Sequence, residues 1–476
     1  MIVIQPSRKQ SPSASHRKAT HRHHSDMDVT DISTRYHLDR QYGFVPQPVP
    51  FQRLPVAWER WETTLDEAAA GKLTHAEHIL QLDGVQKVAE LEKSRLWRDA
   101  VENMPILPID DLIGHEMELR RAHQVLGFIA QFYAHTLSLT SPISIPRSVT
   151  LPLLKVSKEL QIAPFITYWD HALDNWTLID NTQPLSSNNI VSQTLFTGTA
   201  DENELYMIDI RLELEGAVAL EQLRLVAEQV TTSSEPDEAL IAARLHRAAT
   251  AIDSATQALK TTHKLVSPHA FYHTIAPWLR GPNLDPAHRV WEWEGADEVS
   301  GSEEMLRWVG SPNAGQSPLF PAIDASLGIA EDDKKKAFLD RVLPYMLRGH
   351  REYIQHLRSN GCPVRAYVEG RKRREKCSEA SAASEAVAAY NEAVEAVKRF
   401  RTAHLSIVSQ YILIPARKAE GLKRNHGYEA ATPRNSPAPA AEGEGTEGKQ
   451  SIGEVMGGLM GFLKEFRDAT EGVTVD

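Results

Sequence analysis

Apolar residues recur at intervals of three and four along most of this chain, which is the spacing of one face of an amphipathic helix. Strict alternation of apolar and polar residues, the pattern of a half-buried strand, is rare. The predicted fold class is therefore all-α, with Pro344 expected to kink or interrupt one helix. The spacing predicts helices over residues 58–70, 85–101, 111–138, 153–160, 204–230, 236–264, 331–358 and 379–413.

Breaks in the helical pattern predict the domain organisation. Residues 1–36 are rich in Ser, His, Lys and Arg and poor in apolar side chains, so we expect a disordered tail there. Residues 181–199 are rich in Asn, Ser, Thr and Gly, which is typical of a connection between domains. The predicted parts are the tail (1–36), a small helical domain (37–196), a large helical domain (197–425), a low-complexity linker (426–451) and a C-terminal helix (452–476).

Composition excludes several classes of protein. The 476 residues are too many for one small core, and a hydrophobic share of 42% suits a globular protein. A formal net charge of −11, without a basic stripe, argues against a nucleic-acid partner. The two cysteines, Cys362 and Cys377, support neither a disulfide framework nor a cysteine metal site. No apolar run reaches the roughly 20 residues of a membrane helix, so we expect no membrane partner and a cytoplasmic location.

One helical histidine is the first candidate for chemistry. His350 lies in the predicted helix 331–358, which a loop of small residues, 310–317, precedes. A helical imidazole supplies an axial nitrogen to haem iron, and a loop of small residues approaches the opposite face of a haem closely. His350 is therefore predicted as a metal ligand. A structural histidine is the commoner role for a lone helical imidazole, and this alternative stays open.

Six stretches of the chain match one known family, in the same order. They span residues 36–44, 168–176, 270–272, 314–329, 345–351 and 404–416. Each stretch is weak by itself, but their common order is specific. From about residue 36 to residue 418 the chain resembles the indoleamine 2,3-dioxygenases, haem enzymes that open the indole ring of tryptophan to N-formylkynurenine.

The resemblance implies a two-domain helical haem enzyme of tryptophan catabolism, in the kynurenine pathway. Haem b is expected in the large domain, with His350 as the proximal iron ligand and the active site between the domains. The expected partners are O₂ and a small indole or amine, and the expected oligomeric state is a monomer. The resemblance maps the substrate pocket to Tyr168, His171, Ala172, Phe271, Tyr272, Asn313 and Ala314.

The chain departs from the family pattern at three pocket positions. Ala276 stands where the family has an arginine that binds the substrate carboxylate, Asp209 stands where it has a serine, and Leu205 stands where it has an aromatic residue. A charge-assisted contact to a carboxylate is lost at Ala276, although Arg280 is an alternative source of the cation. We expect a substrate that lacks a free carboxylate and presents an amine to Asp209. A register slip around 205–209 is the alternative.

Three functions stay open from the sequence. The first is a dioxygenase that acts on tryptophan or a related indole. The second is a haem enzyme with altered chemistry, a monooxygenase or peroxygenase, in which Asp209 and His171 supply protons as catalytic residues. The third is a haem-binding protein without turnover. The number of oxygen atoms incorporated from labelled O₂ distinguishes the first two.

Overall fold

The computed structural model describes residues 35–329, 331–376, 384–425, 460–461 and 463–475. Within them the fold is mainly helical, as predicted, with four strands of three residues each. The residues before 35 and the predicted linker 426–451 lie outside the described residues. The predicted helices are confirmed as α2 (Glu59–Ala70), α4 (Gly84–Glu102), α5 (Glu116–Thr136), α6 (Arg147–Leu160), α7 (Ala200–Thr232), α8 (Glu238–Lys260) and α16 (Glu385–Val408).

Proline interrupts the predicted helix 331–358, as expected. Its two parts are α13 (Asp333–Val342) and α14 (Arg348–Ser359), joined through a 3₁₀ turn, η9 (Leu343–Tyr345). Pro344 occupies that turn, because its ring and its missing N–H do not fit a helix interior. The other helices are α3 (Ala76–Ile79), α9 (Thr262–Leu265), α10 (Pro268–Ala270), α11 (Ser302–Leu306), α12 (Leu319–Leu327), α15 (Pro363–Lys376) and α17 (Ile414–Asn425).

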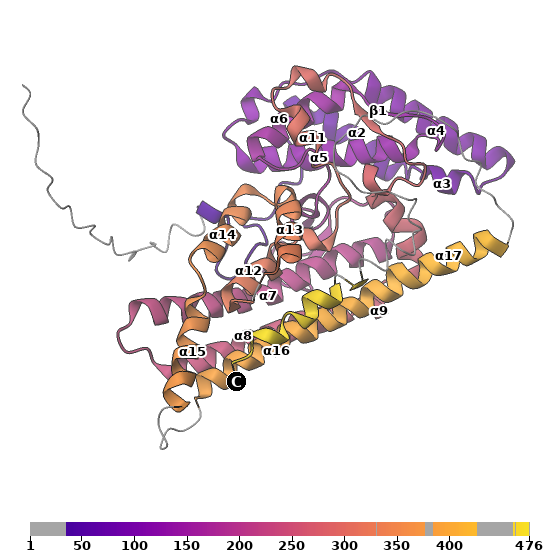
Figure 1. Cartoon of the computed structure of the whole chain (residues 1–476). Helices are drawn as coiled ribbons and strands as arrows, with labels where there is room; N and C mark the ends of the chain where they lie inside the picture. The colour runs from indigo at the N-terminus through magenta and orange to yellow at the C-terminus, as the bar shows by residue number, and fades with distance from the viewer. Residues whose placement is uncertain (1–34, 330, 377–383, 426–459, 462, 476) are drawn as a thin grey trace, which may run out of the picture.

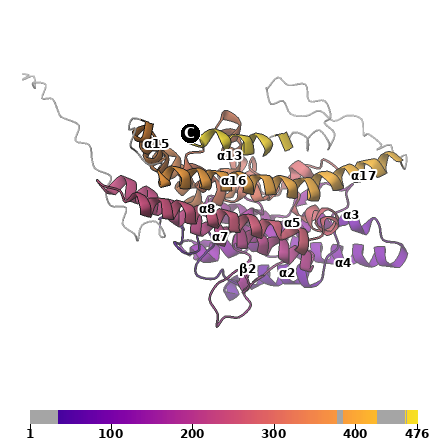
Figure 2. The ribbon, with the colours of Figure 1, turned by 90° about the horizontal axis from the view of Figure 1, so that it is seen from below.

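Two large hydrophobic cores organise the described residues. The first lies among α2, α4, α5 and α6, which form the upper part of the molecule in Figure 1. The second lies among α7, α8, α12 and α16 in the lower part. Figure 2 shows α7, α8 and α16 side by side, and α8 packs along both of the other two. Among the described helices, none combines the length and the apolar character needed to cross a membrane.

The two cores do not follow the predicted boundary at residue 196. Leu38 and Phe44 belong to the second core, and Trp278 and Trp291 belong to the first. The strand β4 (Trp291–Trp293) pairs in parallel with β1 (Ile143–Ile145), which carries the later segment into the first core. A second pair, β2 (Trp176–Leu178) with β3 (Ile190–Ser192), closes the loop before α7. Segments of each predicted domain therefore pack into the core of the other one.

Helix α7 lies between the two cores and contributes buried side chains to both. Tyr206, Met207 and Ile210 pack into the first core, whereas Ile208 and Leu212 pack into the second. A helix with apolar residues on most of its circumference is one that is buried on most sides. Side chains on its remaining stripe are therefore placed at the junction of the two cores.

Candidate active site

Three residues form that stripe on α7: Leu205, Asp209 and Glu213. They are spaced four apart, so they lie on one helix face. Glu213 is fully buried, and its Oε1 accepts hydrogen bonds from Ser317 Oγ at 2.6 Å and from the Tyr168 hydroxyl at 3.4 Å. Its Oε2 has no partner. The stripe thus brings together α7, the turn before η3 and the loop before α12.

Asp209 is the least expected group at this site. Burial, and then the neighbouring Glu213, raise the pKa of the Asp209 carboxyl to about 8. Burial also raises the pKa of Glu213 to about 7. No hydrogen-bond partner for the Asp209 side chain occurs in the described part of the chain, and the side chain is only half-buried by area. The Asp209 carboxyl is therefore an unpaired polar group on this stripe of α7.

A π-helical turn, η3 (Trp169–Leu173), carries the next predicted pocket residues. Burial lowers the pKa of His171 to about 4, so its imidazole is neutral. Its Nδ1 lies 2.8 Å from the Thr167 carbonyl, to which Nδ1–H donates, and Nε2 is left as an acceptor. The ring contacts Tyr206 at 5.0 Å and Tyr168 at 5.7 Å between centroids. Ala172 is fully buried beside it.

His404, on α16, was missed by the sequence prediction. It has no hydrogen bond, ion pair or ring contact with the described residues, and burial lowers the pKa of its imidazole. Like Asp209, it lies deep in the protein and yet keeps accessible surface. Its position at the start of the matched stretch 404–416 was the available signal. His404 is therefore a neutral imidazole without a partner among the described residues.

His350, the predicted metal ligand, is enclosed by aromatic side chains. Its ring packs against Phe44 at 4.8 Å and Trp169 at 5.4 Å, and the residue is 1% exposed. Its Nε2 lies 3.4 Å from the carbonyl oxygen of His37. Burial lowers the pKa of this imidazole, so it is neutral, which is the form that binds a metal ion. Its role as the axial ligand of a haem stays a prediction.

Half-buried apolar side chains lie on elements that pack against α7. Phe271 lies on a second π-turn, η4 (Phe271–Ile275), 5.9 Å from the Tyr411 ring, and η4 also packs on α7. On the other side Phe320 of α12 stacks on Phe400 of α16 at 3.8 Å. The half-buried residues that pack against this shared core include Leu205, Phe271, Phe320, Ile407 and Ile412. Tyr272 is also half-buried, with its ring 5.0 Å from His273.

The loop 310–317 differs from its predicted role. Asn313 and Ala314 are exposed, and Asn313 Oδ1 accepts the Gly315 N–H at 2.9 Å, which begins the turn η8 (Ala314–Gln316). Gln316 of this loop is buried, and its side chain accepts the backbone N–H of Tyr168 at 2.9 Å. Gln316 therefore positions the loop against η3, whereas the two predicted contact residues face outward.

Arg280 does not replace the cation that is missing at Ala276. Ala276 is half-buried and begins a 3₁₀ turn, η5 (Ala276–Leu279), directly after η4. Arg280 follows that turn and forms an ion pair with Glu77 at 2.5 Å. Its guanidinium is therefore already committed to a carboxylate of α3.

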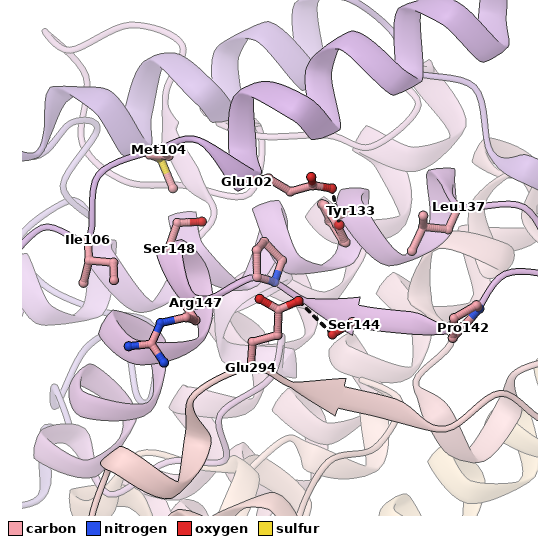
Figure 3. Close-up of a pocket in the computed structure, with 11 residues that line it drawn as sticks. Glu102, Met104, Ile106, Tyr133, Leu137, Pro142, Ser144, Arg147, Ser148 and Glu294 are labelled. Atoms are coloured by element: carbon pink, nitrogen blue, oxygen red, sulfur yellow. Dashed lines mark hydrogen bonds between the residues drawn. The ribbon is translucent and has the colours of Figure 1, made fainter.

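A separate cavity of about 450 Å³ opens in the upper part of the molecule, among α4, α5, β1 and α6 (Figure 3). Glu102 accepts the Tyr133 hydroxyl at 2.7 Å, and Glu294 accepts the Ser144 hydroxyl at 3.0 Å. These polar groups satisfy one another and lie apart from the residues described above. The cavity does not belong to the candidate site.

Two buried histidines have the chemistry of a haem ligand. Burial keeps the imidazoles of His350 and His404 neutral, and a neutral imidazole is a ligand that haem iron takes from a protein. The half-buried side chains of Phe271, Phe320 and Ile407, which pack against the second core, have the apolar character that suits the flat macrocycle.

Comparison with known proteins identifies the family of the chain. A family model described as indoleamine 2,3-dioxygenase matches residues 32–473. The indoleamine 2,3-dioxygenase of Saccharomyces cerevisiae is 27% identical over 472 residues, covering 94% of this chain and 95% of that protein. Indoleamine 2,3-dioxygenase 1 of Rattus norvegicus is 27% identical over 462 residues, covering 94% and 98%. A 6-hydroxytryptophan 2,3-dioxygenase of Fusarium equiseti is 26% identical over 433 residues, covering 89% and 95%. Because the family model spans nearly the whole chain, this protein belongs to the indoleamine 2,3-dioxygenase family.

Proposed function

We propose that this protein is a haem-dependent dioxygenase that inserts both atoms of O₂ into the indole ring of tryptophan or a related indole, giving an N-formylkynurenine-type product. The observation that carries the proposal is membership of the family, whose model matches residues 32–473 and supports the reaction class. A relative named for 6-hydroxytryptophan supports the wider class of indoles.

The chain's own residues hold the cofactor and the substrate. His350, the position that the resemblance maps to the iron, would hold the haem, which when bound would supply the iron chemistry that activates O₂. Leu205 and Phe271 hold the indole ring through apolar and aromatic contact, which contributes about 1 kcal/mol beyond burial for an aromatic pair. The half-buried side chains around them exclude water from the reacting atoms.

Two polar groups determine where the site can donate and where it can accept a hydrogen bond. The Asp209 carboxyl, with a pKa of about 8, holds a proton at neutral pH and is a potential hydrogen-bond donor. The His171 imidazole is neutral and offers an acceptor at Nε2. A donor and an acceptor on one side of a flat apolar site orient a polar substrate within it.

Reaction with isotopically labelled O₂ tests the proposal. The purified protein is loaded with haem and mixed with an indole under ¹⁸O₂. The mass of the reaction product is then measured by mass spectrometry. Two labelled oxygen atoms in a ring-opened product are expected. Haem binding followed by no oxygen uptake with any indole would leave a haem-binding protein without turnover and contradict the proposal.

Asp209 favours one alternative function. A protonated carboxyl above a haem is a proton donor, and proton delivery promotes cleavage of the O–O bond. A monooxygenase or peroxygenase would follow from that chemistry. The same experiment decides, because such a product contains one labelled atom or none.

A further inference from the structure

Two buried histidines join α3 to α5. His75 directly precedes α3, His135 lies on α5, and each of them is 2% exposed. His75 Nε2 lies 3.3 Å from His135 Nδ1, and the two rings stack at 5.0 Å between centroids. The other nitrogen of His75, Nδ1, accepts the Glu77 N–H at 3.2 Å, and His135 Nε2 lies 2.8 Å from the Arg280 carbonyl oxygen. Every ring nitrogen of the pair is therefore engaged.

These contacts fix where each ring carries its proton. A backbone N–H only donates, so His75 Nδ1 carries no proton. A carbonyl oxygen only accepts, so His135 Nε2 carries one. If both imidazoles are neutral, the remaining proton lies on His75 Nε2, which donates it to the bare Nδ1 of His135. A second proton on either ring would set one N–H group against another, so the contacts are complete only while both rings are neutral.

The surroundings of the pair also favour neutral rings. Burial lowers the pKa of His135 to about 4, and it lowers that of His75 well below its usual value. The Trp278 ring lies 5.1 Å from the His75 ring, and the Trp291 ring lies 5.8 Å from the His135 ring. A proton taken up here would place a charge among aromatic side chains.

The ionisable groups around the pair are largely paired with one another. They are Glu77 and His78 on α3, Arg280 after η5, and Asp285 and Arg289 on the following loop. Glu77 forms an ion pair with Arg280, and Asp285 forms one with Arg289 at 2.7 Å. Since both carboxylates already have a cation, a charged imidazole would add an unbalanced positive charge.

Helix α3 also contacts the turns η4 and η5. Glu77 pairs with Arg280 at the end of η5, and His78 Nε2 donates to the His273 carbonyl of η4 at 2.5 Å. A helix as short as α3 is not stable by itself, so its position depends on its contacts. Its contact with α5 through His75 therefore helps to hold η4 and η5 in place.

We propose that α3 is a clip opened by acid, which holds η4 and η5 near α5 while His75 and His135 are neutral and detaches when either ring takes up a second proton. In the open form the rings meet water, where an imidazole titrates near pH 6.5. The closed form is therefore fully favoured above about pH 6.5 and loses stability as the pH falls below it, because the open form binds more protons. Phe271 lies on η4, and only an effect of the clip on indole binding rests on the function proposed above.

Hydrogen exchange of the full-length protein at pH 7 and pH 5 tests the inference. The readout is the protection of the His78, Ile79 and Leu80 amides, which bond within α3, relative to the intrinsic exchange rate at each pH. Protection of these amides is expected to fall by about tenfold or more at pH 5, while that of the amides of α8 changes by less than about threefold. Unchanged protection of α3, or an equal loss in α8 through global unfolding, would overturn the inference.

The double variant His75→Gln with His135→Gln assigns the effect to the pair. A glutamine amide offers one acceptor and a donor, as a neutral imidazole does, but it does not titrate. The variant is expected to keep the protection of α3 at pH 7 and to lose less than about threefold at pH 5. His115→Gln is the matched control, because His115 is exposed at the start of α5, and it is expected to keep the wild-type pH dependence.

A wild-type pH dependence in the double variant would overturn the role of the pair. If that variant folds poorly, the comparison of α3 with α8 in the wild type decides alone. The clip and the dioxygenase function also fail separately. If α3 opens in acid but no indole consumes oxygen, the clip stands and the function is wrong, and if an indole is oxidised but α3 stays closed in acid, the function stands and the clip is wrong.

Discussion

At the scale of single residues, His350 and His404 show how little a helical histidine says about its role. Both are neutral imidazoles on helices within stretches that resemble the family. The ring of His350 is enclosed by Phe44 and Trp169, whereas that of His404 has no partner among the described residues. The resemblance maps His350, and not His404, to the iron.

Alanine substitution of each histidine separates the two roles. His350→Ala is expected to weaken haem binding more than about tenfold, because the axial nitrogen is lost. His404→Ala is expected to keep the haem spectrum. The Soret spectrum after reconstitution measures both effects. Rescue of the His350→Gly spectrum by free imidazole completes the test, and loss of haem in His404→Ala alone would reverse the assignment.

The buried carboxyl of Asp209 makes stability depend on pH. Its pKa is about 8 in the folded protein, against about 4 in an unfolded chain. Folding therefore favours the protonated form, and the free energy of unfolding decreases as the pH rises from about 4 to 8. Asparagine does not ionise, so Asp209→Asn is expected to stabilise the haem-free protein by about 2 kcal/mol at pH 8 and by less at pH 5. Thermal unfolding at both pH values measures this, and an equal effect at both would contradict it.

At the scale of elements, three π-turns border the site. They are η3 (Trp169–Leu173), η4 (Phe271–Ile275) and η10 (Ser409–Leu413), which joins α16 to α17. Each π-turn inserts an extra residue into a helix and turns the following side chains to a new direction. The turns η3 and η4 pack on α7, and η4 also packs on η10. The π-turns determine the directions in which the side chains of His171, Phe271 and Tyr411 point. A regular helix would point them in other directions.

Gln316 joins one of these turns to the loop 310–317. It accepts the Tyr168 N–H at 2.9 Å and donates to the Ser311 carbonyl at 3.1 Å. Gln316→Leu leaves that buried N–H without a partner, which costs about 1–3 kcal/mol, and is expected to weaken indole binding because η3 is released. Asn313→Ala, at an exposed position of the same loop, is expected to cost less than about 1 kcal/mol. Urea unfolding and calorimetric binding measure both, and equal costs would contradict the role of Gln316.

At the scale of the whole molecule, the C-terminal segment ties α16 to α12. Residues 463–468 are helical, and Thr470 and Val473 after them are fully buried. Arg401 of α16 donates to the Phe466 carbonyl at 3.2 Å and pairs with Asp324 of α12. The C-terminal segment therefore stabilises the position of α16, the helix that carries His404.

Truncation after residue 425 tests this brace. Loss of the segment uncovers buried side chains and is expected to destabilise the protein by about 2–4 kcal/mol. Glu465→Gln, which removes only the exposed ion pair with Lys334, is expected to change stability by less than about 1 kcal/mol. Thermal unfolding compares the two. An unchanged melting temperature after truncation would show that the segment contributes no stability.

The sequence by itself determined the mainly helical fold, the positions of the long helices and the family, because these depend on local periodicity and on the order of matching stretches. Asp209 also stood out from sequence alone as an unusual residue for its position. Only the tertiary structure decided that His350 is enclosed, that Gln316 is buried while Asn313 is exposed, and that Leu38 packs in the second core and Trp291 in the first. These outcomes depend on which distant side chains meet, and helical spacing carries no information about that.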